Sequence, residues 1–173
     1  MLIQEKSKCI DNCKNDNIYK YEYNNLCYEN CPNNKISSFE DKYLCMDEND
    51  INNYKNKNIN ESVLENIKEY LLNNYNKTKN GVDIDVETKN VLVTVTNTFN
   101  QINNVDKNTT TINLGECEKK LINYYNISEN ETLYILKMDI KVEGMKIPKI
   151  EYEVYYPLNK THFTFLIYRC VKI

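Results

Sequence analysis

Glycine is scarce in this chain, and its scarcity excludes a first class of function. The 173 residues include only three glycines, Gly81, Gly115 and Gly144, and no two of them are close together. A loop that cradles phosphate with its backbone amides needs several clustered glycines. We therefore exclude a glycine-rich nucleotide-binding loop and expect no cofactor.

Clustered positive charge and long apolar runs are missing as well. The formal net charge is -3 and the Lys and Arg residues are dispersed, so we expect no binding to nucleic acid or to an anionic membrane surface. No apolar run reaches the roughly 18 residues that a spanning helix needs, so no membrane insertion by this fragment is expected. The first eight residues, MLIQEKSK, also lack the apolar run of a secretory signal.

Catalytic motifs are equally sparse. The single histidine, His162, follows a polar turn and has no G-x-S-x-G, H-E-x-x-H or Cys/His/Asn arrangement around it. Glu151 and Glu153 stand two apart on a predicted strand, where they imitate a catalytic carboxylate pair, but a solvated strand shows the same pattern. We therefore predict that the protein is not an enzyme. A hydrolase that uses His162 is the more remote of two alternative functions.

The sequence contains two weak candidates for a metal site. Asp83, Asp85 and Glu87 alternate along a strand and offer oxygen ligands to calcium, although acids opposite an apolar face are common on any solvated strand. The other candidate is a zinc site built from cysteines. We predict no bound metal.

Asparagine is abundant, and it divides the chain. The chain has thirty asparagines, and the longest asparagine-rich stretch, residues 46–60, has no periodic apolar positions. Such a stretch is typical of a solvated linker. The sequence therefore predicts a cysteine-rich segment at residues 1–45, an Asn-rich linker at 46–60 and a second module at 61–173.

Five of the seven cysteines fall in the first segment and repeat regularly. Their spacing is C-x3-C-x13-C-x3-C-x13-C, a period of eighteen residues, at Cys9, Cys13, Cys27, Cys31 and Cys45. A segment this short cannot bury a core of its own and is typically held together by disulfides. The repeat therefore indicates an oxidising, extracellular setting.

Two questions about these cysteines stay open on spacing alone. Cys9, Cys13, Cys27 and Cys31 could ligate zinc, as in an intracellular zinc-stabilised protein-interaction domain, although zinc pairs usually stand two residues apart rather than three. If the cysteines form disulfides, spacing does not fix the connectivity, and Cys9–Cys27 with Cys13–Cys31 is one possible set.

The run Cys27-Tyr28-Glu29-Asn30-Cys31-Pro32, with Cys45 thirteen residues beyond Cys31, resembles the CxxxCP rhythm of furin-like, growth-factor-receptor cysteine-rich repeats. The resemblance covers residues 9–45 only, and Lys14 stands where the pattern would place proline after Cys13. It implies Cys13–Cys27 and Cys31–Cys45 bridges. It also implies that Cys9 would close a loop opened by a cysteine upstream, so we expect a repeat array truncated at its amino terminus.

Residues 61–173 have the periodicities of an α+β module. A Ser62-x-x-Glu65 capping box predicts the start of a helix in which apolar residues recur at every fourth position along one face. A second helix is expected to begin near Gly115. Strands with alternating apolar residues are predicted at 82–87, 91–99, 134–142, 150–158 and 163–171. The expected fold is an antiparallel β-meander with the two helices packed on one side of it.

Disulfide and glycan candidates extend the extracellular interpretation to the second module. A Cys117–Cys170 bridge would join the second helix to the last strand and leave Cys9 unpaired among seven cysteines. Six N-x-S/T sequons are candidate glycosylation sites, although Asn60 has helix-capping as an alternative role. The sequons begin at Asn60, Asn76, Asn108, Asn126, Asn130 and Asn159.

Tyrosine is frequent, and clustered tyrosine rings are one feature of a recognition surface. Tyrosines crowd the first repeat and the strand near Tyr155, and such rings either recognise ligands or replace a core in small disulfide-rich modules. Together these patterns predict a non-catalytic extracellular fragment of a larger cell-surface or secreted protein, used in adhesion, ligand recognition or spacing. Its partner would be a protein or a glycan, and its oligomeric state is not predicted.

Overall fold

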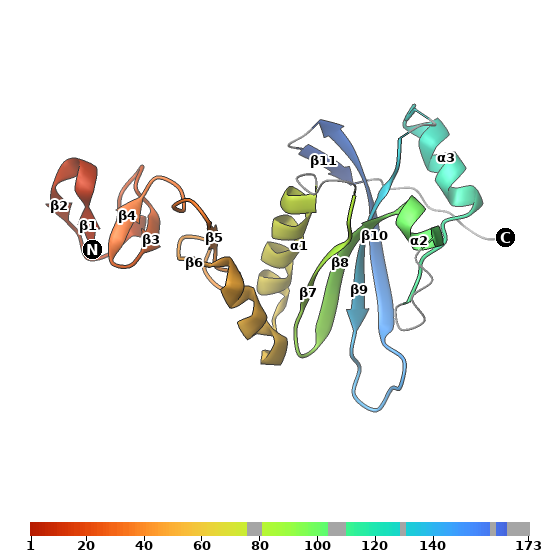
Figure 1. The fold of residues 1–173 in the computed structure, drawn as a ribbon, viewed down its shortest axis with the longest axis horizontal. Helices are drawn as coiled ribbons and strands as arrows, with labels where there is room; N and C mark the ends of the chain where they lie inside the picture. Colours follow the sequence, from red (N-terminus) through yellow and green to blue (C-terminus); the bar gives the residue numbers. More distant parts are fainter. Residues whose placement is uncertain (76–80, 104–109, 129–130, 160–161, 166–173) are drawn as a thin grey trace.

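The computed structural model describes residues 1–75, 81–103, 110–128, 131–159 and 162–165. A row of small β-hairpins at the amino terminus leads into a larger module in which helices pack against a β-sheet (Figure 1). The content is mixed α+β, as the sequence predicts.

The amino-terminal hairpins are three, formed by β1 (Leu2–Ile3) with β2 (Lys8–Cys9), β3 (Tyr21–Tyr23) with β4 (Leu26–Tyr28), and β5 (Lys35–Ser37) with β6 (Cys45–Asp47). The middle hairpin shows how sequence sets the turn. Asn24 and Asn25 connect its strands with φ of 50° and 63°. A two-residue turn of this hand needs positive φ at both positions, which asparagine tolerates better than most residues.

Residues 46–60 are folded, which corrects the expectation of a solvated linker. After β6 the chain forms a 3₁₀ helix, η3 (Glu48–Asn56), in which Tyr54 is only 3% exposed and Ile51 packs against the main core. Residues three apart, such as Ile51 and Tyr54, align on one face of a 3₁₀ helix. A search for the period of an α-helix or a strand does not detect this spacing. The segment therefore belongs to the fold and joins its two parts.

Helix α1 (Glu61–Tyr75) has the apolar face that the sequence predicts, because its four periodic residues are all buried in the main core: Val63, Ile67, Leu71 and Tyr75. Its amino terminus differs from the expected capping box. The side-chain oxygen of Asn60 accepts a hydrogen bond from the backbone N–H of Val63 at 3.0 Å, so Asn60 is the capping residue in place of Ser62.

The sheet of the larger module is the predicted antiparallel meander. It consists of β7 (Ile84–Glu87), β8 (Val91–Asn97), β9 (Tyr134–Ile140), β10 (Lys149–Asn159) and β11 (His162–Phe165), paired in chain order. Every neighbouring pair is antiparallel. Val93 pairs with Met138 at its centre, and both side chains are buried.

Helices cover both faces of this sheet, whereas the sequence predicts them on one side. Helix α1 packs on the face that carries Val93 and Leu136, while α3 (Glu116–Tyr124) packs through Leu121 against Val154, which has the opposite parity. A short helix, α2 (Thr98–Asn103), replaces the predicted end of a strand and leaves Phe99 67% exposed. Both faces of β9 are therefore buried.

Candidate functional site

The two disulfides of the cysteine-rich segment are the ones that the furin-like resemblance implies. Cys13 bonds to Cys27 and Cys31 to Cys45, with Cα–Cα distances of 5.4 and 5.6 Å and the same separation of 14 residues. The alternative connectivity does not occur. Four of the five cysteines are thus oxidised, so the four-thiolate zinc set considered above is not present either.

Cys9 differs from the other four cysteines of the repeat. It lies in β2, its side chain is exposed, and it is a free thiol in the part of the chain that the structure describes. Cys117, in α3, is disulfide-bonded, and its predicted partner Cys170 lies outside the described residues.

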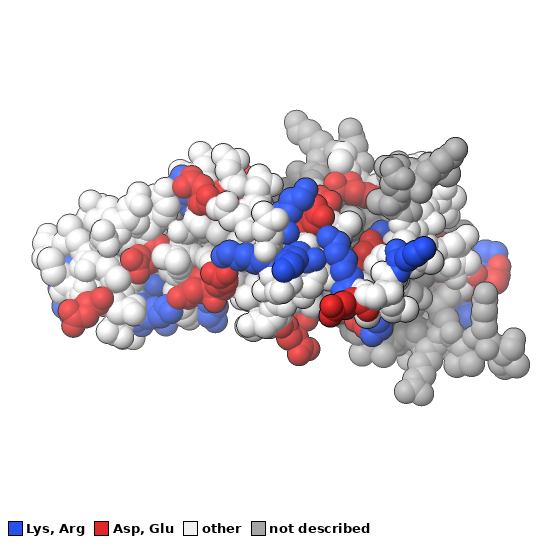
Figure 2. Space-filling view, turned by 90° about the horizontal axis from the view of Figure 1, so that it is seen from below, with Lys and Arg blue, Asp and Glu red and all other residues white. Residues whose placement is uncertain are grey.

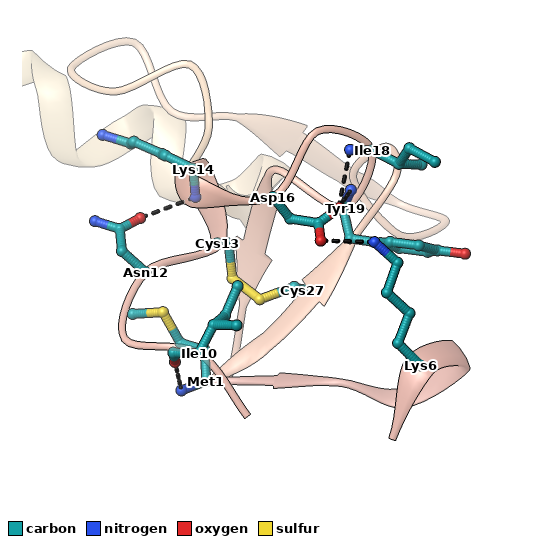
Figure 3. The surroundings of a disulfide bond; sticks show 10 residues. All are labelled: Met1, Lys6, Ile10, Asn12, Cys13, Lys14, Asp16, Ile18, Tyr19 and Cys27. Atoms are coloured by element: carbon teal, nitrogen blue, oxygen red, sulfur yellow. Dashed lines mark hydrogen bonds and ion pairs between the residues drawn. A yellow bond between two sulfur atoms is a disulfide. The ribbon is translucent and has the colours of Figure 1, made fainter. Parts of the chain in front are cut away.

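Asp16 organises the start of the loop that the Cys13–Cys27 disulfide closes (Figure 3). The Asp16 carboxylate accepts hydrogen bonds from Lys6 Nζ at 2.6 Å and from the backbone N–H groups of Ile18 and Tyr19 at 2.9 and 3.0 Å. The hydrogen bond from Lys6, followed by the two backbone donors, holds the pKa of Asp16 well below its usual range. The buried Cys13–Cys27 bridge packs on Ile3 beside this loop.

The tyrosines of the repeat serve as packing surfaces. Lys6 lies over the Tyr19 ring and Lys35 over the Tyr23 ring, each 5.1 Å from the centroid. Tyr19 and Tyr23 are half-buried, as are Tyr21 and Tyr28. These rings stand in for a hydrophobic core, which favours the second of the two interpretations offered for the tyrosines.

The cysteine-rich segment and the α+β module share one core. Phe39, which lies inside the Cys31–Cys45 loop, is 1% exposed, and its ring centroid is 5.1 Å from that of Tyr54 and 5.3 Å from that of Tyr70 on α1. Asn66 on α1 also donates a hydrogen bond from its side-chain amide to the backbone oxygen of Phe39 at 2.8 Å. The cysteine-rich segment is therefore joined to the module by buried aromatic contacts.

A groove of about 380 Å³ runs along this junction between β5 and α1. The rings of Tyr21 and Tyr70 line it, together with the side chains of Lys42, Glu69 and Asn73. Aromatic faces with amide, ammonium and carboxylate groups suit a polar ligand that has apolar faces of its own. This groove is the strongest candidate for ligand contact that involves both parts of the chain.

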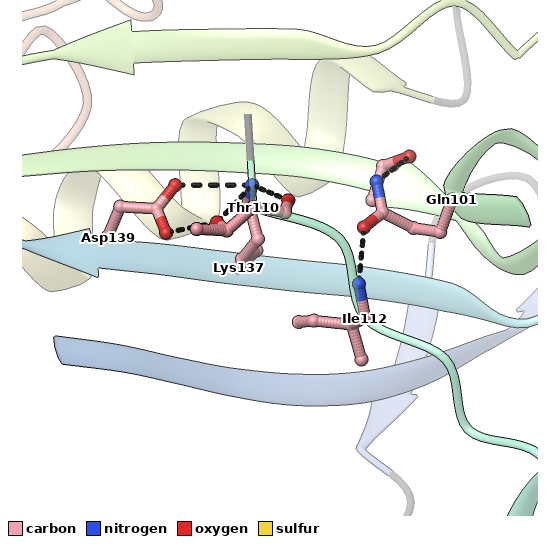
Figure 4. A network of polar contacts seen from close by, with 6 residues as sticks. Gln101, Thr110, Ile112, Lys137 and Asp139 are labelled. Carbon is pink, nitrogen blue, oxygen red and sulfur yellow. Dashed lines mark hydrogen bonds and ion pairs between the residues drawn. The ribbon is translucent and has the colours of Figure 1, made fainter. Parts of the chain in front are cut away.

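A buried polar cluster lies on the sheet face opposite α1 (Figure 4). Lys137 is 2% and Asp139 8% exposed, and Lys137 Nζ lies 3.1 Å from the Asp139 carboxylate. Thr110 completes the cluster, because its hydroxyl donates to Asp139 at 2.6 Å while its backbone oxygen accepts from Lys137 at 2.7 Å. The polar groups satisfy one another, so the cluster has the features of a structural network.

The acidic residues considered as calcium ligands are engaged elsewhere or exposed. Asp83 accepts a hydrogen bond from Asn100 at 2.7 Å, Asp85 is exposed, and Glu87 forms ion pairs with Lys55 and Lys141. In the described ranges, no three His, Cys, Asp or Glu side chains gather closely enough to hold a metal ion.

The acids considered as a catalytic pair have lysine partners. Glu151 pairs with Lys149 at 2.5 Å, and Glu153 pairs with Lys68 of α1 at 2.9 Å. Burial lowers the pKa of Lys68, but its hydrogen bonds to Glu65 and Glu153 outweigh burial, and the net shift is upward. Positive and negative side chains lie close together over the face shown in Figure 2. His162 begins β11, and its side chain is outside the described part.

Two of the six sequons have both their asparagine and its side chain within the described residues. Asn60 is exposed while it caps α1, and Asn126 is exposed after α3 with a φ of 52°. Asn76, Asn108 and Asn130 lie outside the described residues, and so does the side chain of Asn159 at the end of β10. The two exposed asparagines leave room for a glycan at each position.

The comparisons with known proteins add no family. No protein-family model, no curated protein and no solved structure matches this chain. Over the described residues, every helix is too short or too polar to cross a membrane.

Proposed function

We propose that this chain is a non-catalytic, extracellular part of a larger cell-surface or secreted protein, in which a disulfide-bonded stalk holds an α+β module for adhesion or ligand recognition. The observation that carries the proposal is the shared core around Phe39, Tyr54 and Tyr70. A solvated linker would let the module turn freely, whereas a buried aromatic junction fixes its direction.

The disulfides support the compartment. Two bridges in a segment of 45 residues are typical of secreted domains, because cytosolic reductants would open them. Exposed asparagines in two sequons agree with this setting. The groove between β5 and α1 is the surface that we assign to a protein or glycan ligand, because both the stalk and the module line it.

The test begins with protein secreted from a eukaryotic host and analysed by intact mass before and after reduction, alkylation and enzymatic glycan removal. The expected result is alkylation of Cys9 alone in the unreduced folded protein, with added sugar. Seven alkylated thiols, bound zinc and no sugar would instead support the intracellular zinc-stabilised interaction domain. A hydrolase would be indicated by turnover that is lost in His162→Ala.

A second measurement tests the ligand assignment. Tyr70→Ala would remove one wall of the groove but also weaken the core, so Asn73→Asp is the sharper variant because Asn73 is exposed on the groove wall. On a glycan and protein-ectodomain array, Asn73→Asp should lose binding that the exposed variant Asn123→Asp on α3 retains. Equal binding by both variants would remove the groove from the proposal.

A further inference from the structure

The aromatic walls of the groove between β5 and α1 are held in place by contacts within the protein. The Tyr70 ring packs against Phe39, and the Tyr70 hydroxyl donates a hydrogen bond to a Glu48 carboxylate oxygen at 3.1 Å. The Tyr21 ring meets the Tyr43 ring edge to face, with centroids 5.6 Å apart. Because both lining rings have fixed neighbours, a ligand would order few side chains when it binds.

Three side chains of the described groove lining are exposed, and all three are polar. They are Lys42, Glu69 and Asn73. Within the part of the chain that the structure describes, none of them forms an ion pair or a side-chain hydrogen bond. Lys35 also lines the groove, but it pairs with Asp47. The exposed polar groups that remain for a ligand are therefore one ammonium, one carboxylate and one amide.

The charges of these groups favour an uncharged ligand. An anionic ligand would be attracted by Lys42 and repelled by Glu69, and a cationic ligand would meet the reverse. A hydroxyl group can both donate and accept hydrogen bonds, and so can the amide of Asn73. A ligand with several hydroxyl groups therefore satisfies the ammonium, the carboxylate and the amide at once.

The size of the groove separates a glycan from a protein surface. Its volume of about 380 Å³ lies near the lower end of the range for small-ligand sites, roughly 300–1,000 Å³. A specific protein–protein interface buries roughly 1,200–2,000 Å², and its centre is depleted of Lys and Glu. The exposed Lys42 and Glu69 are therefore poorly suited to the centre of such an interface.

The aromatic walls suit the other side of a sugar. One side of many sugar rings presents mainly C–H groups, and the negative face of an aromatic ring attracts such weakly positive edges. Tyr21 and Tyr70 bring two rings to the same groove that carries the polar side chains. The lining thus combines an apolar contact with hydrogen-bonding groups.

We propose that the groove between β5 and α1 binds the terminal sugar of an uncharged glycan. The C–H side of the sugar packs against Tyr21 and Tyr70. Its hydroxyl groups donate to Glu69, accept from Lys42 and form hydrogen bonds with the amide of Asn73. This inference rests on the proposed role of the groove in ligand recognition, and it names the class of ligand.

The test uses the full secreted chain on an array of neutral glycans, sialylated glycans and protein ectodomains. Calorimetric titration with methyl glycosides of neutral hexoses and N-acetylhexosamines then measures affinity. Lys42→Gln and Glu69→Gln should each weaken neutral binding by about fivefold, because a charge-assisted hydrogen bond becomes a neutral one. The controls Lys120→Gln and Glu5→Gln change exposed residues outside the groove and should bind as the wild type does.

The two charge variants distinguish the kinds of sugar. Tighter binding by Glu69→Gln together with weaker binding by Lys42→Gln would indicate an anionic sugar and overturn this inference. Absence of binding to every neutral glycan and methyl glycoside would also overturn it.

The remaining outcomes separate this inference from the proposed function. Binding to protein ectodomains alone, lost in Asn73→Asp, would overturn the inference and keep the groove as the ligand site. Neutral glycan binding that Asn73→Asp leaves unchanged would remove the groove from both proposals. Failure of the two disulfides to form in secreted protein would overturn the proposed extracellular function itself.

Discussion

The rings of Phe39 and Tyr70 meet edge to face, with centroids 5.3 Å apart and an interplanar angle of 61°. Phe39 belongs to the last cysteine loop and Tyr70 to the first helix of the α+β module, so one aromatic pair spans the two parts. Such pairs stabilise beyond the area they bury. The Cys31–Cys45 loop and the α+β module should therefore unfold together in one transition.

Removal of the Phe39 ring tests this coupling. Phe39→Ala should lower the free energy of unfolding by about 3–5 kcal/mol, because a fully buried ring is replaced by a cavity. Urea denaturation followed by far-ultraviolet circular dichroism measures the effect on the helices of the module. Phe99→Ala is the matched control, since Phe99 is 67% exposed and its loss should cost little. Unchanged module stability in Phe39→Ala would show that the parts fold separately.

The two disulfides offer a paired experiment with equal loop lengths. The double variant Cys31→Ala/Cys45→Ala and its counterpart Cys13→Ala/Cys27→Ala each open a loop of about 15 residues, worth on the order of 3 kcal/mol. Only the Cys31–Cys45 loop encloses Phe39, so only its loss should lower the melting temperature of the α+β module. Calorimetry measures the melting temperature of each variant. Equal shifts of that temperature in the two variants would contradict the aromatic junction.

The buried pair of Lys137 and Asp139 should behave asymmetrically. Lys137→Ala leaves the Asp139 carboxylate buried without its cation and should cost about 3–5 kcal/mol. The double variant Lys137→Met/Asp139→Leu removes both charges and should recover most of that loss. Urea unfolding of the three proteins measures the difference. A double variant no more stable than Lys137→Ala would show that packing, and not charge, controls this face.

Asp16 should make the first loop sensitive to acid. Its folded pKa lies below the unfolded value of about 3.9, so its contribution to stability is present above that value and is lost as the pH falls through the folded pKa. Unfolding free energies measured at pH 6 and at successively lower pH should fall less steeply in Asp16→Asn. Asp11→Asn is the control, because Asp11 is exposed and lies just before this loop, and it should keep the wild-type slope.

The repeating patterns were the predictable part of this fold. Alternation along 134–140 identified β9, and the four-residue spacing from Val63 to Tyr75 identified the buried face of α1. The cysteine spacing left two connectivities open, and the resemblance to furin-like repeats supplied the pairing that the structure has. Regular periods survive in a sequence because each position meets the same environment again.

The junction could not be predicted, because its contacts have no period. Phe39, Tyr54 and Tyr70 come from a loop, a 3₁₀ helix and an α-helix, and only the tertiary fold brings them together. The groove beside them arises from the same packing and was missed for the same reason. The spacing of Ile51 and Tyr54 was the one available signal, and the surrounding asparagines concealed it.

The two cystine loops also determine how the stalk would respond to tension. Fourteen residues of fully extended chain span about 48 Å, whereas Cys13 and Cys27 are held with Cα atoms 5.4 Å apart. A pulling force could therefore straighten only the short connections outside the bridges. Under such a force the cysteine-rich segment would behave as a nearly inextensible tether, and the tension would reach the aromatic junction at Phe39.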